Sequence, residues 1–152
     1  MAVKSNGLGK GFCAAVVLLW FMHRHQDSAI VLSTAPTFPQ VRHILWRQVH
    51  RLYRPNAELL GGKMLGTRWE IADDRYAMGL SAENADQFQG FHSPNMFIVV
   101  DKAEGVSDEI YEAIEAVMTA ALIPCCFSSA TPPLCQGHSA GPSLKSATFI
   151  TT

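Results

Sequence analysis

Two stretches of the sequence carry residues of the types that could bind and activate a phosphate. The first is a glycine-rich turn near the start, which consists of Lys4, Ser5, Asn6, Gly7, Leu8, Gly9, Lys10 and Gly11. Glycines permit a tight turn whose backbone N–H groups point at an anion, and a lysine beside them adds positive charge. The turn is typical of a phosphate-binding loop, although turns of this composition also serve as ordinary connections.

The second stretch is an apolar run that ends on one carboxylate, Asp101. Residues 96–100 are all apolar, which is typical of a strand buried on both faces of a parallel sheet. The carboxyl end of such a strand is where nucleotide-hydrolysing sheets present an aspartate to a magnesium ion. Buried strands that end in aspartate are common, but the loop and the aspartate together, in this order, predict a nucleotide site.

The elements that would position these residues alternate between strand and helix. We predict helices at 12–23, at 40–54 and from Ser107 onward, strands at 29–34 and 96–100, and a hairpin at 67–78. Pro55 is expected to end the second helix. The third helix would bury a stripe at helical spacing, namely Ile110, Ile114, Val117 and Met118. The alternation predicts an α/β fold with a mostly parallel sheet flanked by helices.

The composition suits one globular domain. The chain has 152 residues, of which 48% are apolar and 16% charged, and its formal net charge is −1. These values exclude a disordered chain and a globally basic nucleic-acid arm.

The charges are unevenly distributed along the chain. Every acidic residue lies at or before Glu115, and after it Lys145 is the one charged side chain. Beyond Leu122 prolines are scattered and no helical period can be drawn. We therefore divide the chain into a domain at 1–122 and a low-complexity tail at 123–152, expected to be disordered. The tail is either an out-of-frame translation or a natural extension.

The spacing of the cysteines and the form of the apolar run near the N-terminus predict a cytoplasmic chain. Four cysteines form no CxxC pair and have no ligand-spaced histidines, so neither a zinc site nor a redox motif is predicted. The apolar run at 12–22 is shorter than the ~20 residues that span a bilayer. With Lys4 and Lys10 before it, this run also has the outline of a secretory signal, but bulky charged residues stand where a cleavage site would lie.

The predicted helix at 40–54 has a basic surface and no acidic residue. Its arginines are Arg42, Arg47, Arg51 and Arg54. Such a face either approaches DNA phosphates or is solvated, with arginines paired to acids elsewhere. Three tryptophans, Trp20, Trp46 and Trp69, are expected in the core.

Several stretches also match a known family. They are 4–10 with Ala14-Ala15 and Leu18-Leu19-Trp20-Phe21, Val31-Leu32-Ser33-Thr34-Ala35-Pro36-Thr37 with Gln40-Val41 and Leu45-Trp46-Arg47, Ser81-Ala82-Glu83-Asn84, Phe88-Gln89-Gly90-Phe91-His92, and Val99-Val100-Asp101 before Ala103-Glu104-Gly105-Val106. Over residues 1–120 the chain resembles the ATPase domain of phage terminase large subunits, the motors that drive DNA into a capsid.

The resemblance implies a P-loop NTPase fold, incomplete here, and a set of ligands. Gly9 and Lys10 would hold the β- and γ-phosphates of ATP within the loop at 4–11, and Asp101 would act through Mg²⁺. The intact family works on double-stranded phage DNA with a portal protein, a small terminase subunit and further copies of itself. The implied location is the cytoplasm of a bacterial host that carries a prophage.

Two departures from the family pattern fall on these site residues. Lys102 stands where the family has the glutamate that orients or deprotonates the attacking water, and an ammonium group does not accept a proton at neutral pH. Gly11 stands where the loop has the Ser or Thr that ligates Mg²⁺. We therefore expect a truncated, degenerate copy whose hydrolysis is lost. The alternatives are a non-catalytic nucleotide-binding or interaction module and a small exported protein.

Overall fold

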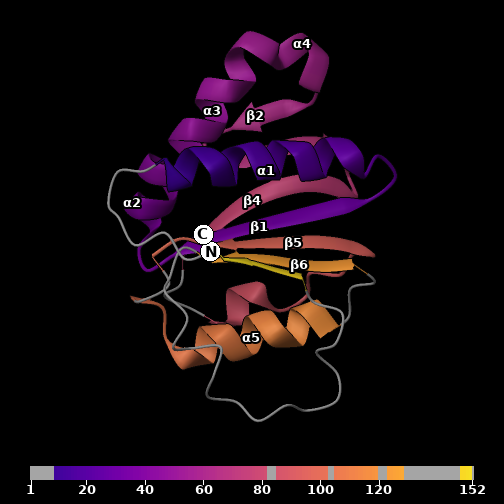
Figure 1. Cartoon of the computed structure of the whole chain (residues 1–152). Helices are drawn as coiled ribbons and strands as arrows, with labels where there is room; N and C mark the ends of the chain where they lie inside the picture. The colour runs from indigo at the N-terminus through magenta and orange to yellow at the C-terminus, as the bar shows by residue number, and fades with distance from the viewer. Residues whose placement is uncertain (1–8, 82–84, 103–104, 120–122, 129–147, 152) are drawn as a thin grey trace.

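The chain folds around one sheet with helices on both faces (Figure 1). The computed structural model describes residues 9–81, 85–102, 105–119, 123–128 and 148–151. Its seven-stranded sheet has the order β2-β3-β4-β1-β5-β6-β7. The strands are β1 (Ala29–Ala35), β2 (Lys63–Leu65), β3 (Arg68–Ala72), β4 (Arg75–Ser81), β5 (Asn95–Val100), β6 (Ile123–Ser128) and β7 (Thr148–Thr151). The predicted α/β class is confirmed.

The helices are divided between the two faces of the sheet. They are α1 (Lys10–Arg24), α2 (Phe38–Gln40), α3 (Arg47–Tyr53), α4 (Ala57–Leu60) and α5 (Asp108–Thr119), with a π-helical turn η1 (Val41–Trp46) and 3-10 turns η2 (Arg54–Asn56) and η3 (Ala85–Phe88). Helices α1 to α4 lie on one side and α5 lies on the other (Figure 1).

The centre of the sheet is parallel, as predicted. Strand β1 pairs in parallel with β4 on one side and with β5 on the other. All seven residues of β1 are buried, and so is β5 after its first residue. Strand β3 pairs antiparallel with β4, which confirms the hairpin predicted at 67–78. Strand β2 then adds to β3, also antiparallel.

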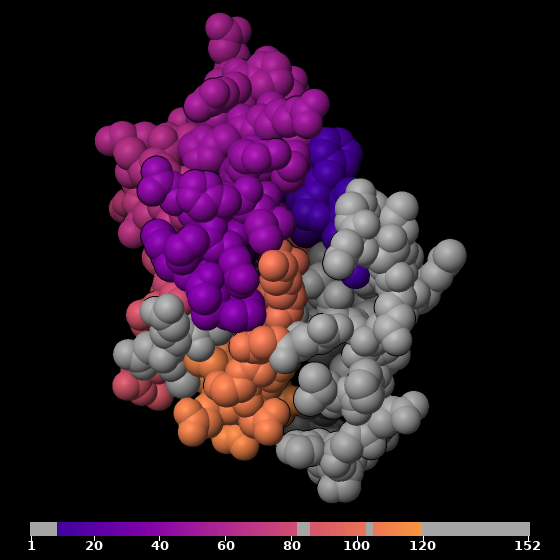
Figure 2. Space-filling view, turned by 90° about the vertical axis from the view of Figure 1, so that its left-hand side faces the viewer, coloured from indigo at the N-terminus to yellow at the C-terminus, as the bar shows by residue number. Residues whose placement is uncertain are grey.

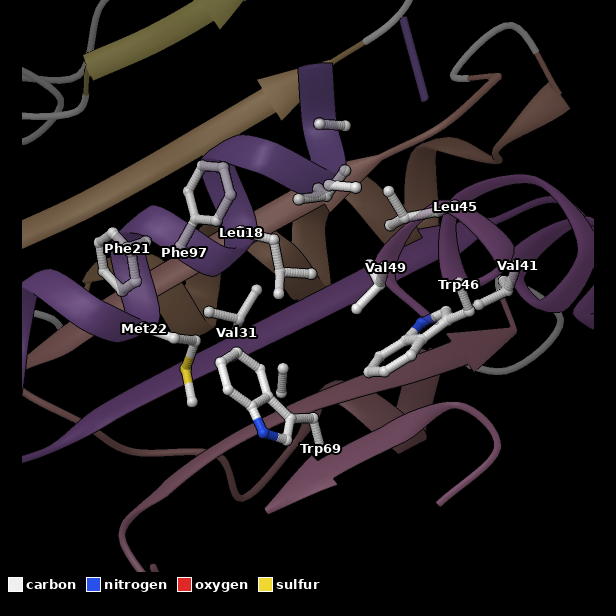
Figure 3. Packing of buried hydrophobic residues seen from close by; sticks show 14 of the residues in the cluster. Leu18, Phe21, Met22, Val31, Val41, Leu45, Trp46, Val49, Trp69 and Phe97 are labelled. Carbon is white, nitrogen blue, oxygen red and sulfur yellow. The ribbon is translucent and has the colours of Figure 1, made fainter. Parts of the chain in front are cut away.

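The core on the α1 side is built from apolar residues of α1, η1, α3 and the sheet (Figure 3). Phe21 of α1 stacks on Phe97 of β5 with ring centroids 5.3 Å apart. Trp46 and Trp69 are buried here, as predicted, but Trp20 is 59% exposed. The prediction for Trp20 is wrong because α1 covers the sheet with one side only, and Trp20 lies on the opposite side.

The core on the other face is formed by α5. Its buried residues are the predicted stripe of Ile110, Ile114, Val117 and Met118. They pack with β1 and β5 residues such as Leu32, Met96 and Ile98. Acidic residues in the first turn favour this helix because they face the positive end of its dipole.

The single helix predicted at 40–54 is wrong in its form. The segment is divided into five successive helical elements, α2, η1, α3, η2 and α4, which differ in helix type. It continues past Pro55, which lies in η2. Trp46 ends the π-helical turn η1, and its indole lies over Gly79, where a Cβ would come within 2.5 Å of Nε1. Trp46 Nε1 donates a hydrogen bond to Ser33 Oγ at 2.9 Å. A contact between residues this far apart in the sequence is not visible in local periodicity.

The sheet also continues after residue 122, where we expected no regular element. Strand β6 pairs in parallel with β5, and β7 pairs in parallel with β6. Pro124 interrupts the apolar run of β6, and β7 has four residues, so neither sequence shows a clear strand pattern. Residues 129–147 lie outside the described part of the chain, and the separate origin of the segment at 123–152 stays a prediction.

Candidate functional site

The candidate site lies at the edge of the sheet where the parallel strands end. In open α/β sheets, ligands bind outside the carboxyl ends of the strands. Asp101 follows β5 at this edge, and its N–H donates to the carbonyl of Thr34 in β1 at 2.9 Å. Figure 2 views the molecule from this side, where the segment after β5 lies against the segment after β1. The hydrogen bond holds Asp101 beside the end of β1.

The N-terminus of α1 reaches the same edge. Residues 25–28 join the far end of α1 to the start of β1, so the helix runs antiparallel to the strands and begins where they end. Gly9 is its N-cap, with a left-handed φ of 74° and open space around it. The backbone conformation, rather than crowding, therefore favours glycine at this position. Lys10 is the first helical residue, and the N–H groups of a first turn attract anions.

The predicted loop is described only at its end. Gly9, Lys10 and Gly11 form the start of α1, while Lys4, Ser5, Asn6 and Gly7 lie outside the described residues. Asp101 continues the alternation of Phe97 and Val99, which belong to the core on the α1 side. The start of α1 and Asp101 thus share one edge and one face of the sheet.

Lys102 has an unusual backbone conformation for a lysine. Its φ is 53°, in the left-handed region that favours glycine. The N–H of Gly105 donates to the Lys102 carbonyl at 3.0 Å, which closes a turn directly after β5. A Cβ on Gly105 would lie 2.7 Å from Cγ of Pro36. Gly105 is therefore packed tightly on Pro36, the residue that follows β1.

The residues present could share a magnesium ion with a nucleotide, but with little support from protein ligands. Mg²⁺ in phosphate sites is held by one or two carboxylates together with phosphate oxygens. Asp101 supplies a carboxylate, and Gly11 supplies no hydroxyl. Within the described residues, no group of three or more His, Cys, Asp or Glu could hold a metal by itself. Any metal here depends on the ligand for most of its contacts.

Sequence reasoning missed two buried polar side chains near this edge, Thr34 and Ser81, and one half-buried one, Gln40. Thr34 at the end of β1 and Ser81 at the end of β4 are 2% and 6% exposed. Thr34 Oγ1, Ser81 Oγ and Gln40 Oε1 are buried and form no hydrogen bond within the described part of the chain. For Thr34 and Ser81, the sequence signal that could have found them is a polar residue at the end of an apolar strand, because ligands bind at the carboxyl ends of strands.

The basic surface predicted on the helix at 40–54 is present in the folded chain. Arg42, Arg47, Arg51 and Arg54 are exposed. Within the described part of the chain these four arginines form no ion pair, so the pairing with acids that we considered is not observed. The exposed acids of α5 lie on the opposite layer, and they are Asp108, Glu109, Glu112 and Glu115.

None of the described helices combines the length and apolar character needed to cross a membrane.

Comparison with known proteins gives a likeness in fold. No family model and no curated protein matches the sequence. Among solved structures, the chain is similar to the large terminase ATPase domain of Thermus phage P74-26, with a TM-score of 0.53 and 19% sequence identity. The match covers 76% of this chain and 54% of that chain, so this chain spans about half the length of its neighbour. The chain thus shares the α/β fold of about half of that domain.

Proposed function

We propose that this chain is a terminase-like ATPase fragment that binds ATP and has lost most of its hydrolysis. The observation that carries the proposal is the start of α1, where left-handed Gly9 caps the helix directly before Lys10. This start lies at the edge and on the face of the sheet that hold Asp101. The likeness to a terminase ATPase domain supports the same assignment.

Each site residue would have a defined part in binding. The N–H groups of the first turn of α1 would donate to phosphate oxygens, and the Lys10 ammonium would balance the charge of the β- and γ-phosphates. Asp101 would hold Mg²⁺, which neutralises phosphate charge when it is bound. Lys4, Ser5, Asn6 and Gly7 complete the loop in this proposal.

The same residues explain why hydrolysis would be lost. A general base must accept a proton from the attacking water, and Lys102 in its charged form has no lone pair for it. Gly11 adds no hydroxyl to the metal shell. Binding depends on the backbone and on Lys10, so it would survive both replacements.

We also propose double-stranded DNA as the partner of the basic surface formed by Arg42, Arg47, Arg51 and Arg54. Four exposed arginines that have no acidic partner among the described residues support this choice, since phosphate neutralisation is the sequence-independent part of DNA binding. Contacts with a portal protein, a small terminase subunit and further copies of the chain are proposed for the intact motor.

Equilibrium titration with a fluorescent ATP analogue in the presence of Mg²⁺ tests the nucleotide site. We expect Lys10→Ala to weaken binding about tenfold or more, because it removes a charge-assisted contact with phosphate. Lys63→Ala is the matched control, since Lys63 is an exposed lysine on β2. Absence of binding by the unchanged chain, or equal losses in both variants, would contradict the proposal. Phosphate release at the rate of an active motor would contradict the loss of hydrolysis.

A further inference from the structure

Helix α1 exposes a row of apolar side chains along the side that does not pack on the sheet. The row consists of Phe12, Val16 and Trp20, which are 45%, 42% and 59% exposed. Residues four apart lie one above the other on a helix, so the three side chains form one stripe, here called the α1 stripe. Single exposed apolar residues need no explanation, but three on one helix face indicate a partner.

The opposite face of α1 is fixed in the core. Ala15, Leu18 and Met22 are fully buried, and the helix packs on β1, β4 and β5. Turning the helix to bury the α1 stripe would bring these core residues into water. The fold therefore keeps the stripe on the surface.

The charged side chains of α1 are all basic. Lys10 is the first residue of the helix and Arg24 the last, and no acidic residue lies between them. Arg24 is exposed and continues the α1 stripe at the same four-residue spacing. Helix α3, which packs beside α1, adds the exposed Arg47 and Arg51. This face fits a partner that combines apolar material with negative charge.

A second copy of the chain fits the α1 stripe poorly. The exposed parts of the three side chains amount to roughly 300 Å², whereas a stable interface buries about 800 Å² on each partner. Two α1 helices packed together would also bring only basic residues to the contact. A lipid bilayer has neither restriction, because fluid acyl chains adapt to a narrow row of side chains and anionic headgroups attract Lys and Arg.

We propose that α1 binds the surface of an anionic lipid bilayer, with Phe12, Val16 and Trp20 inserted where the headgroups meet the acyl chains. Aromatic side chains favour this boundary, and the indole N–H of Trp20 can donate to a headgroup there. Arg24 contacts lipid phosphate at one end of the α1 stripe. The helix lies in the plane of the bilayer and does not cross it. The inference goes beyond nucleotide binding and does not depend on it.

The fluorescence of Trp20 tests the insertion, because the other two tryptophans of the chain, Trp46 and Trp69, are buried. The chain is mixed with phosphatidylcholine vesicles with or without phosphatidylglycerol, and with the same vesicles carrying bromine on the acyl chains. We expect a blue-shifted emission and quenching by bromine when phosphatidylglycerol is present. Absence of bromine quenching with these anionic vesicles overturns the proposal.

Three variants locate the binding on α1. Val16→Asp keeps Trp20 as the reporter and should weaken vesicle binding about tenfold or more, since a charge replaces an inserted side chain. Arg24→Ala should weaken binding about fivefold, and only to anionic vesicles. Leu59→Asp is the matched control, because Leu59 of α4 is 77% exposed and lies outside the α1 stripe. Equal losses in Val16→Asp and Leu59→Asp would refute the role of α1.

Two further measurements identify a different occupant of the α1 stripe. A blue shift of Trp20 emission that grows with protein concentration in the absence of lipid would show that a second copy covers the stripe. Quenching by single-stranded DNA without quenching by brominated vesicles would show that bases stack on it. Either result overturns the bilayer as the partner and leaves the proposed ATP site, which the nucleotide titration tests separately, standing.

Discussion

Lys102 combines a chemical and a conformational departure in one residue. Its ammonium group stands where a terminase-like site would need a carboxylate, and its backbone is left-handed with a φ of 53°. A side chain with a Cβ is disfavoured in that region, because the Cβ comes close to the following carbonyl oxygen. The turn that Gly105 closes on the Lys102 carbonyl keeps the conformation in place. Lys102 is therefore a point of backbone strain, and under the proposed function it also replaces the base.

Replacing Lys102 by glycine should relieve this strain. We expect Lys102→Gly to raise the free energy of unfolding by about 0.5–1 kcal/mol, the left-handed cost less the extra chain entropy of glycine. Lys63→Gly, in the extended conformation of β2, should lower it instead. Urea denaturation of both variants measures the two changes. A loss of stability in Lys102→Gly would show that the left-handed turn is not strained.

Arg75, the first residue of β4, connects this strand to α1. Its Nε and Nη2 atoms both donate to the carbonyl of Met22, at 3.1 and 2.6 Å. Arg75→Ala should lower the free energy of unfolding by about 1–2 kcal/mol, since a charged donor near a helix C-terminus is lost. The midpoint of urea denaturation checks this value. Arg42→Ala, at an exposed position, should change it by less than about 0.5 kcal/mol, and equal effects would refute the importance of the contact.

At the scale of elements, the local sequence pattern was sufficient to predict an element whose residues are arranged by burial alone. The stripe of α5 and the apolar run of β5 were both predicted, because burial alone determines their residue spacing. The segment from α2 to α4 was not, since the contact of Trp46 with Gly79 depends on the register of β4 beside β1. The prediction that Trp20 is buried was wrong for a related reason. The sequence of an apolar helix does not show which of its sides is left exposed.

The basic surface on η1, α3 and η2 makes a prediction at the same scale. The double variant Arg47→Glu with Arg51→Glu should weaken binding to double-stranded DNA about tenfold or more, and should lower the slope of log affinity against log salt concentration by about two. Fluorescence anisotropy over a salt series gives both quantities.

The matched control for DNA binding changes the same net charge elsewhere. Arg24→Glu with Lys63→Glu alters two exposed basic residues on α1 and β2. This control should retain most of the affinity. If both double variants lose affinity equally, DNA responds to overall charge and the surface on η1, α3 and η2 has no special part.

At the scale of the whole molecule, the formal net charge of −1 conceals a separation of charge across the sheet. The layer of α1 to α4 carries the exposed arginines, and α5 on the opposite layer carries exposed acids. Such a distribution orients the molecule in the field of a polyanion, with α5 directed away from it. Composition alone excluded a globally basic chain but could not reveal this arrangement.

The candidate site was predictable in part. Gly9, Lys10 and Asp101 were found from residue type and order, because loop, helix and strand end follow each other in the chain. Thr34, Gln40 and Ser81 were not found, since their interest comes from burial without hydrogen bonds, which tertiary packing creates. The strands after residue 122 were missed because Pro124 interrupts the apolar run of β6 and β7 has four residues.

The contacts that Asp101 and Gly105 make at the end of β1 also bear on the arginines. Asp101 is hydrogen-bonded to Thr34, and Gly105 lies against Pro36 with no room for a methyl group. Two residues beyond Pro36 the chain enters α2, which leads into the arginine-bearing helices. Asp101 and Gly105 are therefore in direct contact with the segment that leads to the arginines.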